Sequence, residues 1–395
     1  MLRERLLKRE LVQSAAEYPV VTVLGPRQSG KTTLVKMTFP NLPYRLLEAP
    51  DIRRIAAEDP RGFLMDSKDG MIIDEIQRVP ELLSYIQEIV DSESRPGRFI
   101  LTGSHQPRIN QAVSQTLAGR TAILTLLPYS LPEIRGKQQF LDPFELCCRG
   151  FYPRLHEQGL KLGRFYSGYV QTYLERDVSA LINLKDLGSF QTFLKLLAGR
   201  VGQLINYSSL GNDTGVSSTT IKSWIQVLKA SFLVYELPPY HANVRKRLVK
   251  SSKLYFTDTG IVCYLLGISN AGQLERDPLR GAIFENLVVM EIVKQELNDG
   301  ERPDLYFYRD SHGNEVDLLV KRGRSIIPVE IKSAATFKTA FVKGIQSFSE
   351  TAEGGSLPGY VLYNGDKDLS FRDTQVINPF RKDTSQAKFL DMKFR

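Results

Sequence analysis

The sequence predicts an α/β fold, with a parallel sheet flanked by helices in residues 1–139. Three short apolar runs, at residues 20–24, 70–74 and 98–102, each end at polar residues, as buried parallel strands do. Residues 82–90, between the second and third run, have the apolar spacing of a helix. Because strands that alternate with helices pair in parallel, the simplest arrangement is a series of βαβ units.

Length and composition indicate a folded protein of several domains. The chain has 395 residues, more than one ordinary core accommodates, and 42% of them are hydrophobic and 24% charged. Its apolar stretches are shorter than the ~18 residues that a membrane span needs, and residues 1–11 carry alternating charges instead of an apolar signal core. We therefore expect a cytoplasmic protein with no membrane partner.

Cysteine and histidine positions predict no metal site of the zinc type. Cys147 and Cys148 are neighbours and Cys263 stands alone, and the four histidines are scattered. We expect these thiols to be reduced and structural. The net charge of +8 favours polyanionic partners such as nucleic acid without identifying one.

Residues 140–270 are predicted to form a helical domain that contains a winged helix. A Gly-Asn-Asp-Thr-Gly turn at residues 211–215 precedes a helix at residues 217–228. Two strand-like runs follow, at residues 232–237 and 253–257, with a basic connector between them. Helix, turn, helix and a pair of strands are the pattern of a winged helix.

Residues 271–395 are predicted to return to α/β structure as a third domain. Apolar spacing indicates a helix at residues 282–297, and residues 305–308, 316–320 and 326–331 alternate like strands.

A phosphate-binding pattern, GxxxxGK[ST], occupies residues 25–32, directly after the first apolar run and before a helix-like stretch. Gly25 and Gly30 let backbone N–H groups point inward around a phosphate, where side chains would obstruct them. Lys31 would reach the β- and γ-phosphates, and the Thr32 hydroxyl would bind Mg²⁺. We therefore predict a site for ATP and Mg²⁺. Its expected cofactor-binding residues are Gly25, Pro26, Arg27, Gln28, Ser29, Gly30, Lys31, Thr32 and Thr33.

The second apolar run delivers two carboxylates to the end of its strand, where ligands bind in open α/β sheets. Asp74 would hold Mg²⁺, and Glu75 would polarise the attacking water. A solvated turn or helix cap is the alternative for this acidic pair, and the upstream phosphate loop counts against it. The third run ends in Thr102 and Ser104, whose hydroxyls could sense the γ-phosphate, although Thr-Gly-Ser is also an ordinary turn.

Five segments together carry a resemblance to a known ATPase family. They are Gly-Pro-Arg-Gln-Ser-Gly-Lys-Thr-Thr-Leu (25–34), Ile-Ile-Asp-Glu-Ile-Gln (72–77), Leu-Thr-Gly-Ser (101–104), Leu-Ala-Gly-Arg (117–120) and Tyr-Leu-Glu-Arg-Asp-Val (173–178). Over most of its length the chain resembles the archaeal-type AAA+ ATPases with a C-terminal domain of unknown function. The resemblance implies a sensor 1 role for Thr102 and Ser104. It also implies a homo-oligomer, a ring in many AAA+ proteins, with Arg120 or Arg176 as the arginine finger; each could equally form a structural salt bridge.

Three carboxylates and a lysine are expected to converge in the third domain. Glu285 lies on its predicted helix, Asp317 on one strand, and Glu330 and Lys332 on the next. Alternation along a strand puts Glu330 and Lys332 on one face, with Ile331 behind. Such a set would bind one or two Mg²⁺ ions, through Asp317 and Glu330 above all, and generate a hydroxide nucleophile that Lys332 orients or activates.

This order of Glu, Asp and Glu-x-Lys after Pro328-Val329 resembles the PD-(D/E)XK nuclease superfamily. The resemblance implies a restriction-endonuclease-like α/β domain in which Glu285, Asp317, Glu330 and Lys332 are catalytic. Two alternatives to a catalytic site stay open: a surface strand with a salt bridge, and a nuclease fold kept only for binding.

The middle domain carries residues suited to DNA contact. Lys222 lies on the second helix of the predicted helix-turn-helix, among short polar side chains. The lone Trp224 on that helix is expected in the core. The residues expected to form a wing on the DNA backbone are Arg245, Lys246, Arg247, Lys250 and Lys253.

The sequence thus predicts an AAA+ type ATPase whose nucleotide cycle moves a winged helix and a nuclease-like domain on DNA. The competing class is a switch or scaffold ATPase that recruits a protein partner, with a catalytically silent third domain.

Overall fold

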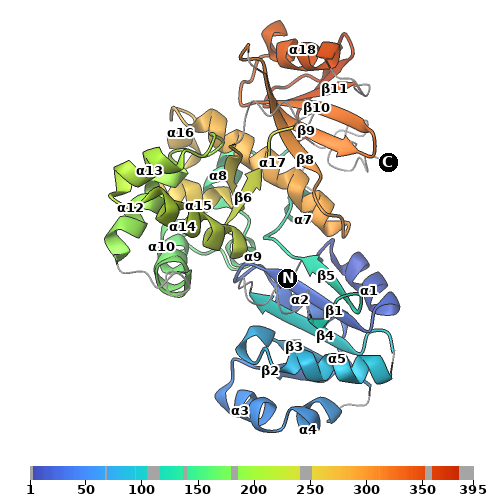
Figure 1. The fold of residues 1–395 in the computed structure, drawn as a ribbon. Coiled ribbons are helices and arrows are strands. Elements are labelled where there is room, and N and C mark those ends of the chain that lie inside the picture. The colour runs from blue at the N-terminus through green and yellow to red at the C-terminus, as the bar shows by residue number, and fades with distance from the viewer. Residues whose placement is uncertain are drawn as a thin grey trace. The chain divides into compact units, whose positions relative to one another are not determined.

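A computed structural model describes residues 3–66, 69–93, 95–104, 116–136, 140–178, 186–240, 251–310, 312–351 and 358–381, with backbone only for 175–178 and 351. The chain divides into two compact units (Figure 1). Unit 1 comprises Met1–Tyr129, Ala230–Leu233 and Glu296–Glu301, and unit 2 comprises Ser130–Lys229, Val234–Gln295 and Arg302–Arg395. No helix in the described ranges combines the length and the apolar character that crossing a bilayer would need.

Unit 1 contains a five-stranded sheet in the order β2-β3-β4-β1-β5, with every pair parallel. The three predicted strands are confirmed as its centre. The strands are β1 (Val20–Gly25), β2 (Tyr44–Leu46), β3 (Met71–Asp74), β4 (Phe99–Ser104) and β5 (Thr121–Thr125). Because β4 lies between β1 and β3, its C-terminal residues lie between the phosphate loop and the acidic pair.

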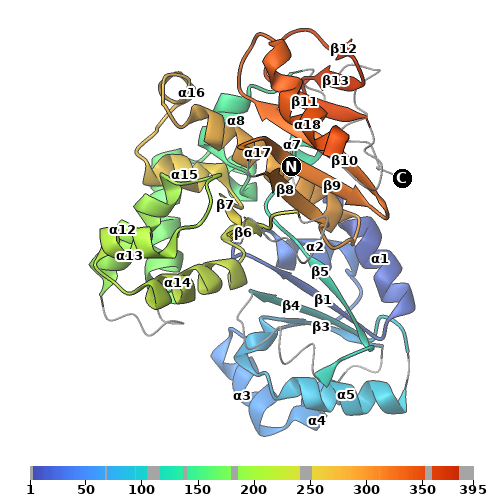
Figure 2. The same cartoon turned by 45° about the horizontal axis from the view of Figure 1, so that its top comes forward.

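Helices cover both faces of this sheet (Figure 2). Val20 and Leu24 of β1 pack with α4 and α5 in one core cluster, while Val21 and Val23 pack with α1 and α2 in another. Burial on both faces explains why these strands are continuous apolar runs in the sequence. The helices are α1 (Lys8–Glu17), α2 (Lys31–Thr38), α3 (Pro50–Glu58), α4 (Pro60–Met65), η1 (Ile76–Arg78) and α5 (Leu82–Ser92).

The first part of unit 2 is helical. Its elements are α7 (Leu131–Arg135), α8 (Pro143–Arg149), α9 (Pro153–Glu157), α10 (Leu162–Tyr169), η2 (Val170–Val178), α12 (Leu187–Ala198), α13 (Tyr207–Thr214), α14 (Ser218–Ala230), α15 (Thr259–Leu265) and α16 (Ala271–Leu274). The cysteines Cys147, Cys148 and Cys263 are free and buried here.

The predicted turn at residues 211–215 is wrong in extent. Residues 211–214 continue α13, which the Asn206 side chain caps, and only Gly215 adopts a left-handed conformation, at φ 73°. Glycine suits this position, because a Cβ on Gly211 would lie 2.7 Å from the backbone oxygen of Val216, just after the helix. Trp224 of α14 is buried, as expected, with its ring centroid 5.1 Å from that of Phe193.

Strands β6 (Val234–Leu237) and β7 (Lys253–Phe256) pair antiparallel after α14. The remainder of unit 2 is α17 (Arg280–Asn298), except for residues 296–298, which belong to unit 1, and a six-stranded mixed sheet in the order β12-β13-β11-β10-β9-β8. Its other elements are β8 (Leu305–Arg309), β9 (Glu315–Arg322), β10 (Ser325–Lys332), η3 (Thr339–Val342), α18 (Lys343–Thr351), β11 (Gly359–Tyr363), β12 (Leu369–Phe371) and β13 (Thr374–Ile377). The helix and three strands predicted for this region are confirmed.

Candidate active site

The loop between β1 and α2 has the backbone of a phosphate cradle. Gly25 has φ 155°, Gln28 63° and Gly30 95°, and Gly30 caps the N-terminus of α2. A Cβ on Gly25 would lie 2.1 Å from the Leu126 carbonyl oxygen, so only glycine fits. The Ser29 hydroxyl is buried and has no hydrogen-bond partner among the described residues. An anion at this helix N-terminus would satisfy donors that the protein leaves open, so the loop fits a nucleotide phosphate.

Lys31 lies across the mouth of this loop. Its ammonium donates to the carbonyl oxygens of Gly25 at 3.0 Å and Pro26 at 2.9 Å. Burial lowers the pKa of Lys31 to about 8, against the opposing effect of the carboxylates of Glu75 and Asp74. A phosphate would give the buried ammonium the charged partner that the loop carbonyls only partly replace.

Asp74, at the end of β3, accepts hydrogen bonds from side chains that include Thr32, the other residue expected to bind Mg²⁺. Its Oδ2 accepts hydrogen bonds from the Thr32 hydroxyl at 2.8 Å and the Tyr44 hydroxyl at 2.6 Å, and its Oδ1 accepts one from the Thr102 hydroxyl. The contact between Thr32 and Asp74 brings together the two side chains that hold Mg²⁺ in P-loop enzymes, so the donor set fits the ion. Tyr44 lies outside every sequence motif described above. Burial and the hydrogen bond to Asp74 raise the pKa of its hydroxyl.

Glu75 is held in an unusual position beside Asp74. Its φ of 60° is rare for a residue other than glycine. The carboxylate accepts hydrogen bonds from the Ser104 hydroxyl, at 3.1 Å, and from the Gln77 amide. Gln77 also donates to the Ser104 hydroxyl at 2.9 Å. The alternative of an ordinary turn at Thr102–Ser104 is wrong, because both residues lie within β4 and contact the acidic pair.

Arg5, which lies outside the sequence motifs described above, forms a hydrogen bond to the backbone of the phosphate loop. Its guanidinium is buried and donates to the carbonyl oxygens of Ser29 at 2.6 Å and Leu127 at 2.7 Å, 4.9 Å from the Tyr129 ring centroid. A peptide group is planar and trans, so holding the Ser29 carbonyl outward directs the next N–H, of Gly30, to the opposite side. Arg5 is therefore expected to orient one of the phosphate donors.

Replacing Arg5 by methionine is expected to weaken ATP binding about tenfold or more, because one peptide of the cradle loses a charged hydrogen bond. Titration calorimetry with ATP and Mg²⁺ measures the effect. Arg9→Met, at an exposed arginine four residues further along the chain in α1, is the matched control and should bind as the parent does. Equal affinity for both variants would show that the loop holds its shape without Arg5.

Of the two arginine-finger candidates, the structure describes the side chain of Arg120 but not that of Arg176. The Arg120 guanidinium donates to both carboxylate oxygens of Asp91, with Nη2 2.9 Å from Oδ2. It also donates to the Ala118 carbonyl oxygen at 3.0 Å. Within one chain, Arg120 thus forms the structural salt bridge given above as the alternative. Its role as an arginine finger in the site of a neighbouring subunit stays a prediction. The side chain of Arg176 lies outside the described residues. Arg27 and Gln28 lie within the phosphate loop, and Thr33 is exposed at the start of α2.

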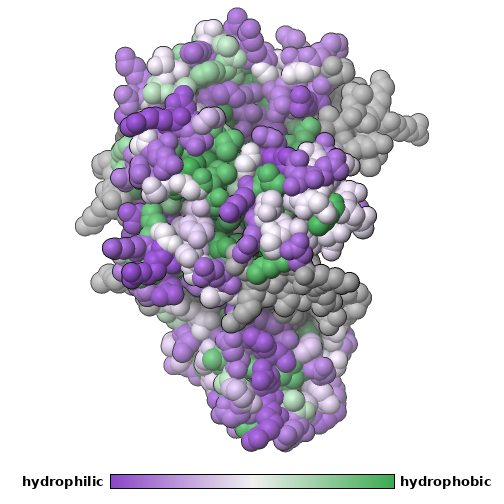
Figure 3. Space-filling view, turned by 90° about the vertical axis from the view of Figure 1, so that its left-hand side faces the viewer, coloured by the Kyte–Doolittle hydropathy of each residue, from purple (hydrophilic) through white to green (hydrophobic). Residues whose placement is uncertain are grey.

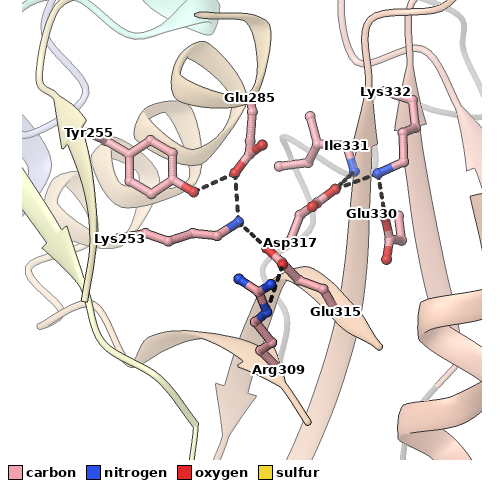
Figure 4. A network of polar contacts seen from close by, with 9 residues as sticks. All are labelled: Lys253, Tyr255, Glu285, Arg309, Glu315, Asp317, Glu330, Ile331 and Lys332. Carbon is pink, nitrogen blue, oxygen red and sulfur yellow. Dashed lines mark hydrogen bonds and ion pairs between the residues drawn. The ribbon is translucent and has the colours of Figure 1, made fainter. Parts of the chain in front are cut away.

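The predicted carboxylates and lysine of unit 2 lie in one cluster of polar side chains, from α17, β9 and β10, and Asp317, Glu330 and Lys332 contact one another directly (Figure 4). The Lys332 ammonium lies 2.8 Å from Asp317 Oδ2 and 2.5 Å from Glu330 Oε2, and the Ile331 N–H donates to Asp317 Oδ2 at 2.8 Å. The strand register explains why Asp317, Glu330 and Lys332 lie together. Strands β9 and β10 pair antiparallel, and Glu330 and Lys332, two residues apart on β10, point to the same face of the sheet. Glu285 instead contacts Lys253 and Tyr255, which the sequence did not predict to lie here.

Burial and like charges perturb these carboxylates. Burial raises the pKa of Glu330 well above its ordinary value, and the Asp317 carboxylate raises it further. Burial and Asp317 likewise raise the pKa of Glu285. Burial alone would raise the pKa of Asp317, but the ammonium groups of Lys332 and Lys253 hold it below its ordinary value. Raised carboxyl pKa values in a buried cluster mark a place where added positive charge is favourable.

Lys253 belongs to this network, and its assignment to a DNA-contacting wing is wrong. The residue is buried on β7, and its ammonium contacts Glu315 at 2.6 Å and Glu285 at 3.2 Å. The Tyr255 hydroxyl donates to the same Glu285 oxygen at 2.5 Å. Within the described ranges no three acidic, histidine or cysteine side chains are grouped so as to hold a metal ion. Two lysines instead lie between the acids, so a metal here would have only two carboxylates, those of Asp317 and Glu330.

The predicted DNA-contact residues are only partly described. Lys222 is exposed on α14 beside the exposed Ser223, and Ser218 and Thr219 are exposed one turn earlier. Arg245, Lys246 and Arg247 lie outside the described residues, between β6 and β7.

Three family matches cover successive parts of the chain. Residues 17–135 match a family described as AAA domain, and residues 142–272 and 280–382 match two domains of unknown function, DUF8612 and DUF4143. Domain boundaries at residues 139 and 270 stay a prediction. Among solved structures, the Walker-type ATPase PABY2304 of Pyrococcus abyssi has a TM-score of 0.42 at 15% identity, over 66% of this chain and 94% of that one.

Full-length relatives come from bacteria. The uncharacterized proteins Rv2008c of Mycobacterium tuberculosis and Mb2031c of Mycobacterium bovis are each 31% identical over 387 residues, 96% of this chain and 84% of theirs. A protein of Haemophilus influenzae is 21% identical over 83% of this chain and 86% of its own. The chain therefore belongs to the family of these mycobacterial proteins, as an AAA-type P-loop ATPase with a C-terminal DUF4143 domain.

Proposed function

We propose that the chain hydrolyses ATP with Mg²⁺ in unit 1 and uses this cycle to act on nucleic acid, specifically DNA. The observation that carries hydrolysis is the contact of Thr32 with Asp74 directly beside Glu75, at the open end of the sheet that holds the phosphate loop. A site that only binds a nucleotide with Mg²⁺ would need the loop, Thr32 and Asp74, but not a second carboxylate at Glu75.

Each group in unit 1 has a distinct part in this proposal. The loop N–H groups and Lys31 bind the phosphates, and Thr32 and Asp74 would hold Mg²⁺, which would supply charge neutralisation for the phosphates. Glu75 accepts a proton from the attacking water and orients it. Gln77 and Ser104 hold the Glu75 carboxylate, and Thr102 holds Asp74, so each acid is positioned by β4 or η1.

Support for nucleic-acid contact comes from the middle of unit 2. Helices α13 and α14 are followed by the antiparallel pair β6 and β7, the element order of a winged helix. The exposed face of α14 carries Lys222 among hydroxyls, a suitable set for phosphate contact. Figure 3, which faces the side drawn left in Figure 1, shows hydrophilic residues interspersed with hydrophobic ones on this side.

The test is the salt dependence of duplex DNA binding together with DNA-stimulated ATP hydrolysis. Lys222→Gln should lower the slope of log K against log salt by about 0.9, the value for one lost phosphate contact. Lys229→Gln is the control on the same helix, because Lys229 already pairs with Glu236 at 2.5 Å. A triple alanine variant of Arg245, Lys246 and Arg247 should lose the stimulation.

The competing proposal is a nucleotide switch that recruits a protein partner. It predicts equal ATP hydrolysis with and without DNA and no salt-dependent DNA binding. Either result in the parent protein would remove DNA from the proposal while leaving the ATPase untouched.

We propose metal-dependent phosphodiester cleavage as a second activity, at the carboxylate network of unit 2. The supporting observation is Lys332 between Asp317 and Glu330, with raised carboxyl pKa values that a divalent cation would relieve. Asp317 and Glu330 would hold the ion, with phosphate or water oxygens as further ligands. Lys332 would orient the attacking water.

Plasmid cleavage with Mg²⁺ or Mn²⁺ tests this second activity. A variant with Glu330→Ala and Lys332→Ala should lose cleavage, while Lys31→Ala should retain it if ATP is not required. Glu350→Ala is a control at an exposed position of α18. Equal cutting by the double variant and the parent would assign the cleavage to a contaminant and remove the proposal.

A further inference from the structure

We propose that Tyr44 is a positioning residue of the nucleotide site, whose hydroxyl fixes the Asp74 carboxylate in the orientation that binds Mg²⁺ together with Thr32. The inference rests on the ATP and Mg²⁺ site proposed above for unit 1. It adds a residue of β2, a strand that carries neither the phosphate loop nor the acidic pair.

The first argument is that β2 and the residue after it hold Asp74 at two points. Strand β2 lies at the edge of the sheet and pairs parallel with β3, with Leu46 opposite Asp74 (Figure 1). The Leu47 N–H donates to the Asp74 carbonyl oxygen at 3.0 Å, which fixes the backbone. The Tyr44 hydroxyl donates to Asp74 Oδ2 at 2.6 Å, which fixes the side chain. A carboxylate that could otherwise rotate is therefore held in one orientation.

The second argument is the direction of the Tyr44 hydroxyl. Tyr44 is only partly buried, whereas Asp74 is 2% exposed. A partly buried tyrosine can leave its hydroxyl in water, but this hydroxyl contacts a buried carboxylate. The Lys36 ammonium lies 4.4 Å from the centre of the Tyr44 ring and stabilises the ring from α2. Burial and the hydrogen bond to Asp74 raise the pKa of the hydroxyl, so it stays a donor at neutral pH.

The third argument is how the acceptor positions of Asp74 are used. An ionised carboxylate offers about four lone-pair positions. On Asp74, Oδ2 accepts from Tyr44 and Thr32, and Oδ1 accepts from Thr102. All of these donors are neutral hydroxyls, and within the described ranges no ammonium or guanidinium forms an ion pair with this buried carboxylate. Its charge and one acceptor position, on Oδ1, are therefore left for a cation.

Tyr44→Phe tests the inference, because it removes the hydroxyl and keeps the ring beneath Lys36. Hydrogen-bond partners of metal-binding side chains typically contribute about 10–100-fold to metal affinity. We expect the variant to bind AMP-PNP, a non-hydrolysable ATP analogue, about tenfold more weakly with Mg²⁺ and as tightly as the parent in EDTA. Metal-free binding is unchanged because it depends on the phosphate loop and Lys31.

Calorimetric titration of the full chain with AMP-PNP measures both affinities without turnover. Electron paramagnetic resonance of Mn²⁺ added to the protein with AMP-PNP measures the metal affinity directly, and it should fall by the same factor. Tyr85→Phe is the matched control on α5: Tyr85 is also partly buried, with the Arg61 guanidinium 5.6 Å from the centre of its ring. That variant should bind as the parent does under both conditions. In an Asp74→Asn background, Tyr44→Phe should have no further effect, since the hydroxyl acts through that carboxylate.

Parent-like affinity of Tyr44→Phe with Mg²⁺ would overturn the inference and leave the proposed hydrolysis standing. An equal loss with Mg²⁺ and in EDTA would also overturn it, because Tyr44 would then only support the shape of the nucleotide site. A parent whose affinity does not change with Mg²⁺ would remove both the inference and the ion from the proposed function. If Tyr44→Phe behaves as expected but the parent does not hydrolyse ATP, the inference stands and the proposed hydrolysis falls.

Discussion

Replacing Glu75 by glutamine lowers ATP turnover by about 10²–10⁴, the range for loss of a general base, while ATP affinity stays close to that of the parent. The amide keeps the shape of the side chain but cannot take a proton from water. ATP binding depends on the loop and Lys31, which the change does not touch. A separation of turnover from affinity is thus the signature of the role proposed for Glu75.

Single-turnover hydrolysis and calorimetric ATP binding, on the same protein, measure the two quantities. Glu81→Gln, the same substitution at an exposed glutamate before α5, is the control and should hydrolyse at the parent rate. Parent-like turnover in the Glu75 variant would contradict the assignment of Glu75 as base and direct attention to another acceptor.

Replacing Lys294 by methionine destabilises unit 2 by about 3–5 kcal/mol, because it leaves a buried carboxylate without its charged partner. Lys294 lies 2.7 Å from Glu291 on α17, and at most 2% of either side chain is exposed. Burial already raises the pKa of Glu291, and Lys294 opposes that rise. The Lys294 ammonium also lies 3.7 Å from the centre of the Phe151 ring.

Chemical denaturation followed by circular dichroism measures this effect as a shift in midpoint. Lys229→Met is the matched control in unit 2: its ammonium also pairs with a glutamate, but 46% of the side chain is exposed. Exposed pairs are worth about 0–1 kcal/mol, so the control midpoint should hardly move. Similar losses in both variants would mean that burial of the Lys294 pair adds nothing.

The sequence predicted which residues lie together at the phosphate-loop edge of the sheet, because this region is built from short contiguous segments. The phosphate loop follows a strand directly, and Asp74 and Glu75 end another strand of the same parallel sheet. Strand direction alone then brings the two segments to one edge. Thr102 and Ser104 were placed by the same rule, and the structure adds that β4 lies between the two strands.

Residues that act across the fold could not be predicted from local pattern. Arg5 contacts a carbonyl 24 residues away and another 122 residues away. Lys253 meets Glu285 across 32 residues and lies beside a basic stretch, which favoured a surface role in the sequence. Only its burial and its two carboxylate partners reveal the other role. Gly211 likewise suggested a turn, but it lies within α13, against the backbone of residues 216–218.

The backbone of Glu75 has a consequence for engineering. A left-handed conformation in a residue with a Cβ costs about 1–3 kcal/mol, which glycine or asparagine largely avoids. Selection for heat resistance alone would therefore tend to enrich those residues at this position and recover stable, inactive proteins. Thermostable versions of this ATPase should be sought with position 75 held as glutamate, and with stabilising changes placed in α3 or α4, away from the phosphate loop.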